Sequence, residues 1–258
     1  MPKKKKKNNK YRPSQRPERP EQKQTNSSWI IIVSTVFVLV LVFVIVGIVV
    51  NNKHSATTNN QSTNQASTSN NQAVTRNIDY SDQPSLGKSD APVKIVEFGD
   101  YKCPYCQRFE LSIFPKIQKD YIDTGKVQFY FLNYILFGDE SRLAAEASES
   151  IYHHYPDRFW SFHQLLYKNQ GPEDKSWVTK GVLEKIAKQA VPNLNVSQLQ
   201  SDMDHSTYDK DINKDITMGG AGLGTPTLLM NGKMLDSSLT FDYAKLSEQI
   251  DQAVNANK

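Results

Sequence analysis

The sequence predicts an α/β domain with a helical insertion, preceded by one N-terminal transmembrane helix. Three observations lead to this prediction. A long run near the N-terminus carries no charge, and further on short β-branched runs alternate with stretches whose apolar residues recur at helical spacing. The only two cysteines stand together in Cys103-Pro104-Tyr105-Cys106, where the first predicted strand gives way to a helix.

Residues 29–50 form the uncharged run, which consists mostly of valine and isoleucine. About twenty apolar residues suffice for a helix to cross a bilayer. A buried core helix is one alternative interpretation. The apolar part of a cleaved signal peptide is another, although such parts usually have only about 7–15 residues. We therefore expect a transmembrane signal-anchor helix over residues 29–50.

The charge of residues 1–28 orients this helix. The segment carries ten lysines and arginines against two glutamates. Basic flanks stay on the cytoplasmic side, so we expect a basic cytoplasmic tail and an extracytoplasmic C-terminal part. The lysine run next to a membrane span is interpreted as a topology determinant, and no nucleic-acid partner is expected.

Residues 51–77 are almost all asparagine, serine, threonine, glutamine and alanine. A segment with so few large apolar residues cannot build a core, so it predicts a disordered polar linker. The remaining residues, 78–258, are numerous enough for one globular domain.

The first element of this domain is a buried strand over residues 93–98, indicated by its β-branched composition. The chain then turns into Cys103. Pro104 suits the first position of a helix, where its missing N–H costs nothing. Pro115 predicts a kink further along. The expected buried face of this helix consists of Cys106, Phe109, Ile113 and Ile117.

A second buried strand is predicted over residues 127–134, and a helical insertion over about residues 139–218. The last helix of the insertion is expected to run from near residue 197 to residue 218. A strand at residues 228–230 follows, and Asn231-Gly232 is a strong signal for a tight hairpin turn. The apolar positions of residues 243–254 predict a closing amphipathic helix.

The two cysteines at this spacing can close a small disulfide or hold two electrons as a dithiol. At a helix N-terminus, free amides and the helix dipole stabilise a thiolate on Cys103. A purely structural disulfide is one alternative, but a four-residue loop restrains little chain entropy. A zinc site is another, but it needs two further ligands at suitable spacing, so no metal is expected.

On these features the chain resembles the DsbA-like branch of the thioredoxin superfamily, in the membrane-anchored form of Gram-positive bacteria. The resemblance covers about residues 78–254 and implies a thioredoxin-like fold. The C-x-x-C follows the first strand, and Glu97 lies six positions before Cys103, where the family keeps a buried carboxylate. Thr225-Pro226 precedes the late strand as the family's cis-proline loop does, and a helical insertion separates the two halves.

The resemblance implies a role for three residues. Cys103 would be the exposed nucleophile with a low pKa, and Cys106 the buried partner that re-forms the disulfide. Glu97 would accept the proton of Cys106, since a carboxyl in an apolar strand has a raised pKa. Strand alternation alone leaves the other possibility that Glu97 faces solvent.

Substrate would be bound next to the cysteines. Pro226 is expected to be cis, and the backbone of Thr225 to face the disulfide and offer strand-like hydrogen bonds to a peptide. Pro104 and Tyr105, between the cysteines, complete the expected contact set.

The resemblance implies a thiol–disulfide oxidoreductase, and the extracytoplasmic location favours an oxidase that donates disulfides to exported proteins with free cysteines. It would have no bound cofactor and would be re-oxidised by a quinone-linked membrane partner. Strong oxidants of the family often carry Pro-His between the cysteines, whereas this chain carries Pro104-Tyr105, as glutaredoxins do. A reductase or isomerase therefore stays open, as does a non-catalytic peptide-binding module.

Overall fold

The structure is a computed structural model and describes residues 74–257. The predicted tail, transmembrane helix and nearly all of the predicted linker lie outside the described residues. Within the described part, no helix is both long and apolar enough to cross a membrane.

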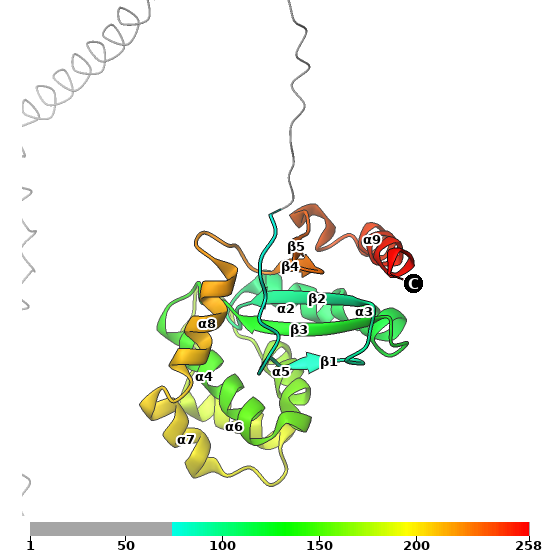
Figure 1. Ribbon diagram of the computed structural model, residues 1–258. Coiled ribbons are helices and arrows are strands. Elements are labelled where there is room, and N and C mark those ends of the chain that lie inside the picture. Colours follow the sequence, from blue (N-terminus) through cyan, green and yellow to red (C-terminus); the bar gives the residue numbers. More distant parts are fainter. Residues whose placement is uncertain (1–73, 258) are drawn as a thin grey trace, which may run out of the picture. The chain divides into compact units, whose positions relative to one another are not determined.

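A mixed sheet forms the centre of the domain (Figure 1). Its order is β1-β3-β2-β4-β5, with β2 and β3 parallel in the middle and the other pairs antiparallel. The strands are β1 (Ser85–Leu86), β2 (Val93–Gly99), β3 (Val127–Asn133), β4 (Thr227–Met230) and β5 (Lys233–Met234). The central strands are buried almost throughout, as their apolar, β-branched and aromatic composition requires.

Eight α-helices pack around the sheet within residues 74–257. Most of the insertion lies below the strands in Figure 1, and α9 lies beyond β4 and β5. The helices are α2 (Pro104–Ser112), α3 (Phe114–Ile117), α4 (Asp139–His154), α5 (Phe159–Lys168), α6 (Lys180–Ala190), α7 (Val196–His205), α8 (Asp209–Gly219) and α9 (Tyr243–Ala256). A π-helical turn over Gln118–Ile122 follows α3, a 3-10 turn over Pro156–Arg158 joins α4 to α5, and a 3-10 turn over Ser237–Leu239 precedes α9.

Most predicted elements are confirmed, and the hairpin turn at Asn231-Gly232 has both residues at positive φ, as its sequence indicates. The single helix expected over residues 197–218 is wrong. Ser206 adopts a left-handed conformation with φ of 49° and ends α7, so the segment forms two helices. No glycine or proline marks this break in the sequence. The short strand β1 was not predicted either.

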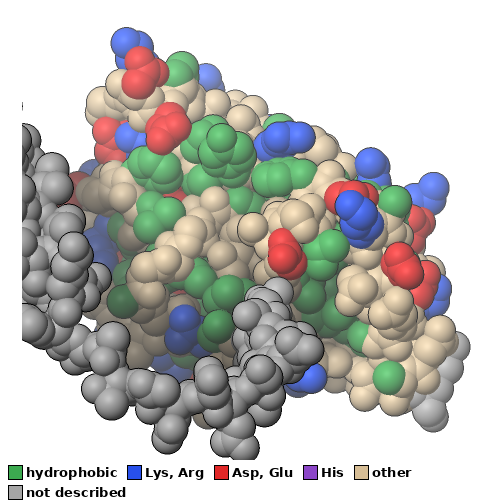
Figure 2. All heavy atoms as spheres, turned by 90° about the horizontal axis from the view of Figure 1, so that it is seen from above, with side chains coloured by type: hydrophobic (Ala, Val, Ile, Leu, Met, Phe, Trp, Pro, Cys, Tyr) green, Lys and Arg blue, Asp and Glu red, His purple; other side chains and the backbone are tan. Residues whose placement is uncertain are grey.

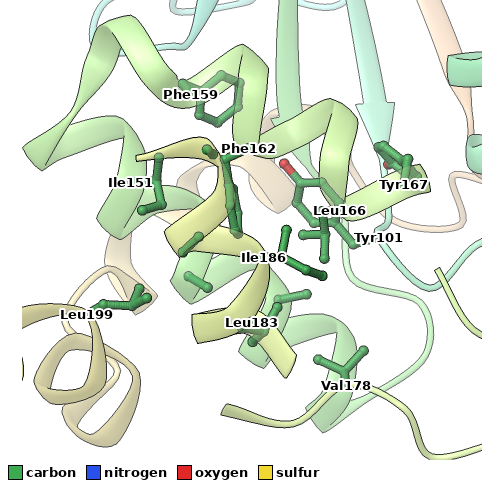
Figure 3. Packing of buried hydrophobic residues seen from close by; sticks show 14 of the residues in the cluster. Tyr101, Ile151, Phe159, Phe162, Leu166, Tyr167, Val178, Leu183, Ile186 and Leu199 are labelled. Carbon is green, nitrogen blue, oxygen red and sulfur yellow. The ribbon is translucent and has the colours of Figure 1, made fainter. Parts of the chain in front are cut away.

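Three apolar clusters make up the core. Two cover the faces of the sheet, and the third joins the insertion to the residues around the cysteines. In this third cluster α5 supplies Phe162, Leu166 and Tyr167, which lie against Tyr101 next to the C-x-x-C (Figure 3). The insertion therefore forms one wall of the site that the cysteines occupy. On the face of the molecule in Figure 2, hydrophobic side chains are interspersed with acidic and basic ones.

Candidate active site

The cysteines lie where β2 ends and α2 begins. A short turn from Asp100 leads into Cys103, which is the N-cap residue of α2, with φ of −70° and ψ of 120°. Pro104 occupies the first helical turn, as expected. Cys106 comes one turn further and faces the core. The local sequence thus places one sulfur at the helix end and the other inside the domain.

Both cysteines are free thiols in this structure. Cys103 Sγ lies 3.3 Å from the carbonyl oxygen of Thr225, to which the thiol donates when it is protonated. The Thr225-Pro226 peptide bond is cis, as the resemblance implied. On the inner side, the amide of Asp100 donates to Cys106 Sγ over 3.4 Å.

The exposure expected for Cys103 is wrong. Only 3% of its surface is accessible, because the loop that carries Thr225 lies against its sulfur and the apolar cluster of the insertion packs beside it. Cys106 is completely buried.

The fold shifts the pKa values of the two thiols in opposite directions. Hydrogen bonding from the Cys106 thiol, helped by the backbone amides of Cys106 and Tyr105, lowers the pKa of Cys103 to about 6 against the cost of burial. Desolvation raises the pKa of Cys106 well above its usual value, and the nearby charge of Glu97 adds to this. At neutral pH this arrangement holds a thiolate on Cys103 and a proton on Cys106.

Glu97 is completely buried in the middle of β2. Strand alternation does not bring it to solvent, because β2 is a central strand whose two faces are both covered. Burial raises the pKa of Glu97 well above its usual range, and the neighbouring carboxyl of Glu110 and the charge of Cys103 raise it further. The structure thus places Glu97 electrostatically close to both cysteines.

Glu110 and His163 are site residues that the sequence analysis missed. Glu110 is 3% exposed and His163 is fully buried, and Glu110 Oε1 lies 3.2 Å from His163 Nε2. A helical signal was present in the sequence, since Glu110 lies four positions after Cys106 and therefore on the same face of α2.

The insertion also holds the backbone of the C-x-x-C, which no local pattern indicates. Gln170 Nε2 donates to the carbonyl oxygens of Tyr101 and Cys103, over 2.7 Å and 3.1 Å. In addition, Lys102 Nζ lies 3.0 Å from Glu140 Oε2 at the start of α4. These contacts join the loop before α2 to two separate parts of the insertion.

An open groove of about 290 Å³ runs beside Cys103. Tyr105, Thr225 and Pro226 line it together with Phe241, whereas Pro104 does not. Tyr105 is 59% exposed and its ring centroid lies 6.2 Å from that of Phe241. The groove therefore offers an aromatic wall and the edge of the cis-proline loop next to the reactive sulfur.

Comparison with known proteins decides the family. The thioredoxin family model matches residues 79–252. The chain belongs to the thioredoxin family. Disulfide bond formation protein D of Bacillus subtilis is 41% identical over 184 residues, which cover 70% of this chain and 82% of that protein.

Solved structures agree with this assignment. The oxidised BdbD of Bacillus subtilis is 40% identical, with a TM-score of 0.67 over 71% of this chain and 98% of that one. DsbA of Chlamydia trachomatis is 23% identical and shares the fold, with a TM-score of 0.59 over 66% of this chain and 90% of that one. The resemblance to the DsbA-like branch is confirmed, and the chain is a protein thiol–disulfide oxidoreductase with a helical insertion in a thioredoxin-like fold.

Proposed function

We propose that this oxidoreductase is an extracytoplasmic oxidase that donates the Cys103–Cys106 disulfide to exported proteins. The observation that carries the proposal is the low pKa of Cys103, about 6, beside the raised pKa of Cys106. A stabilised Cys103 thiolate favours the reduced protein and makes its disulfide a better oxidant.

The reaction proceeds in two exchanges. A substrate thiolate attacks Cys103 Sγ of the disulfide, the S–S bond breaks, and Cys106 leaves as a thiolate. A second substrate thiolate then attacks the substrate sulfur of the mixed disulfide. Cys103 leaves as a thiolate, which its low pKa favours, and the substrate gains a disulfide while the two cysteines gain two electrons.

Glu97 serves as the proton donor and acceptor for Cys106. The leaving Cys106 thiolate lies in an apolar site with a pKa well above the usual value, so it must take a proton at once. Glu97 is close, and its raised pKa keeps it protonated under conditions where an exposed glutamate is ionised. During re-oxidation the same carboxylate takes the proton back.

The groove beside Cys103 is the proposed substrate site. An extended peptide along the cis-proline loop can pair with the backbone of Thr225 and pack side chains against Tyr105 and Phe241. Pro104 does not line the groove, so its proposed role is to fix the start of α2 and not to contact substrate. The predicted anchor over residues 29–50 would keep this site at the outer face of the cytoplasmic membrane. There it would lie near a quinone-linked membrane partner that re-oxidises the dithiol.

A reductase or isomerase is the second candidate, and Tyr105 favours it, because a tyrosine cannot stabilise the Cys103 thiolate as a cationic histidine does. The direction can be tested with reduced, unfolded ribonuclease A and one equivalent of the oxidised full-length protein. An oxidase forms disulfides in the ribonuclease at the rate at which its own disulfide disappears. Failure to transfer the disulfide, together with rapid reduction of insulin by the dithiol form, would overturn the proposal.

A non-catalytic peptide-binding module predicts a different result. A Cys106→Ala variant treated with a substrate disulfide should accumulate a covalent mixed disulfide through Cys103. A binding module would retain the peptide without any covalent bond, which denaturing electrophoresis in the absence of reductant detects.

A further inference from the structure

Arg108 places a positive charge beside the groove next to Cys103. It follows Tyr105 by three positions and therefore lies on the same face of α2, where its side chain is exposed. Its guanidinium carbon lies 4.5 Å from the centre of the Phe241 ring, and Phe241 lines the groove. The loop before α9 thus supplies one aromatic ring that contacts both this cation and the ring of Tyr105.

The charge of Arg108 is not neutralised within the domain. Among the residues that the structure describes, Arg108 forms no ion pair, although Asp242 lies in the adjoining loop. The Asp242 carboxylate instead accepts from the amide of Lys245 and lies 3.1 Å from Lys245 Nζ. Asp236, near the start of the same loop, accepts from the amide of Ser238. Both carboxylates have other partners, so the guanidinium is available to a bound ligand.

The residues that line the groove carry no charge. They contribute two aromatic rings, hydroxyl groups and the cis-proline loop, and they are Tyr105, Gly224, Thr225, Pro226, Thr227, Ser237, Thr240 and Phe241. A guanidinium on the face of an aromatic ring is partly shielded from water and stays protonated. Arg108 therefore adds a fixed cation to the edge of an otherwise neutral peptide site.

We propose that Arg108 makes this oxidoreductase select substrate peptides that carry an acidic residue close to the reacting cysteine. The inference rests on the substrate site proposed above. Arg108 lies five positions after Cys103, about 7.5 Å further along α2 at a rise of about 1.5 Å per residue. An extended peptide covers that distance in two or three residues, at about 3.3 Å each. The acidic residue therefore stands two or three positions from the cysteine that reacts with Cys103.

A Cys106→Ala variant of the full-length protein, with a thionitrobenzoate disulfide on Cys103, measures this selectivity. A peptide thiolate attacks Cys103 Sγ, forms the protein–peptide disulfide and displaces the coloured thiolate, which takes the electron pair of the broken S–S bond. Three blocked peptides share a single cysteine. They differ at the second and third positions on either side of it, which are all Glu, all Gln or all Lys.

The charged residues also change the pKa of the peptide's own thiol. Dividing each rate by that of the same peptide with a small neutral thionitrobenzoate disulfide removes this effect. At low salt the normalised rate of the Glu peptide should exceed that of the Lys peptide about fivefold, the upper range for an exposed ion pair. About 0.5 M sodium chloride should reduce the difference, because salt screens exposed charges.

Substitutions at Arg108 separate charge selection from a structural role. Arg108→Gln should remove most of the preference, and Arg108→Glu should reverse it, so that the Lys peptide reacts faster. Lys210→Glu, exposed at the start of α8, changes the net charge as much as Arg108→Glu does and should keep the preference. Phe241→Leu keeps an apolar wall but removes the ring that positions the guanidinium, so the preference should weaken.

Two outcomes overturn the proposal. One is a preference for the Glu peptide that survives in Arg108→Glu, and the other is a preference that Lys210→Glu abolishes equally.

The same assay distinguishes this inference from the substrate site on which it rests. If small thiols release the coloured thiolate but none of the three peptides does, peptides do not reach Cys103 through the groove, and the proposed substrate site falls. If all three peptides react at equal normalised rates, the substrate site stands and only the selection by Arg108 is wrong.

Discussion

Cys103 Sγ lies 3.3 Å from the carbonyl oxygen of Thr225, 122 positions later in the chain. This contact brings the N-terminus of α2 and the cis-proline loop together at the reactive sulfur. A substrate peptide paired with the loop would therefore present its own sulfur beside Cys103. The geometry of attack is set by the tertiary fold and not by the C-x-x-C alone.

Replacing the nucleophile should abolish exchange without unfolding the domain. Serine is of similar size to cysteine, and its hydroxyl can keep the hydrogen bond that the Cys103 thiol makes to the carbonyl oxygen of Thr225. We expect Cys103→Ser to keep its circular dichroism spectrum and to lose all oxidation of reduced ribonuclease A. Residual activity in that variant would show that Cys106 or another group acts as the nucleophile.

The reactivity of Cys103 should follow its pKa of about 6. Alkylation of the reduced protein by iodoacetamide should rise with pH to a plateau, with its midpoint near that value, because only the thiolate reacts. Cys106 should stay unmodified over the same range, as its pKa lies well above the usual value. Mass spectrometry after proteolysis distinguishes the two sites. A midpoint near the pKa of a free cysteine would contradict the assignment.

Stability of the reduced form should depend on pH in a defined direction. The fold lowers the pKa of Cys103 from its ordinary value to about 6, so between these two values the folded chain binds fewer protons than the unfolded chain. The contribution is complete above the unfolded value and is lost as pH falls through about 6. Relative to Cys103→Ala, the free energy of unfolding should increase from pH 6 to pH 8.5, by at most about 1.4 kcal/mol per pH unit.

Urea unfolding under a non-thiol reductant measures this difference. Comparison with Cys103→Ala at each pH removes the contributions of other groups that titrate in the same range. If the difference in free energy of unfolding between the unchanged protein and Cys103→Ala stays constant or shrinks as pH rises, the fold does not stabilise the Cys103 thiolate.

The insertion should stabilise the active-site loop through Gln170. Its amide donates to the carbonyl oxygens of Tyr101 and Cys103, and loss of both bonds should cost about 1–2 kcal/mol. We also expect Gln170→Ala to alter the rate of alkylation at Cys103. Asn169→Ala is the matched control, because that amide bonds only within α5, to Leu165, at the surface. Equal effects of the two substitutions would rule out a specific role for Gln170.

The sequence predicted those parts of the fold that local patterns specify. Residues 93–98 and 127–134 are continuous apolar runs, and Pro104 marks the start of α2, so their structures follow from composition and spacing. Strand β1 has only two residues, and the break at Ser206 lacks glycine and proline, so neither leaves a local signal.

The same distinction between local motifs and long-range contacts applies to the candidate site. The cysteines and the cis-proline loop carry recognisable motifs, whereas the burial of Cys103 depends on a loop more than a hundred residues away. Glu110 and His163 looked like ordinary polar residues within amphipathic helices. Only the packing of α5 against α2 shows that they meet beside Glu97.

The reduction potential of the Cys103–Cys106 disulfide decides whether this protein acts as an oxidant. Equilibrium of the full-length protein with glutathione redox buffers gives this value. We predict a potential between about −120 and −180 mV, the range from DsbA to protein disulfide isomerase. A potential near or below about −270 mV, as in thioredoxin, would contradict the oxidase assignment and favour a reductase.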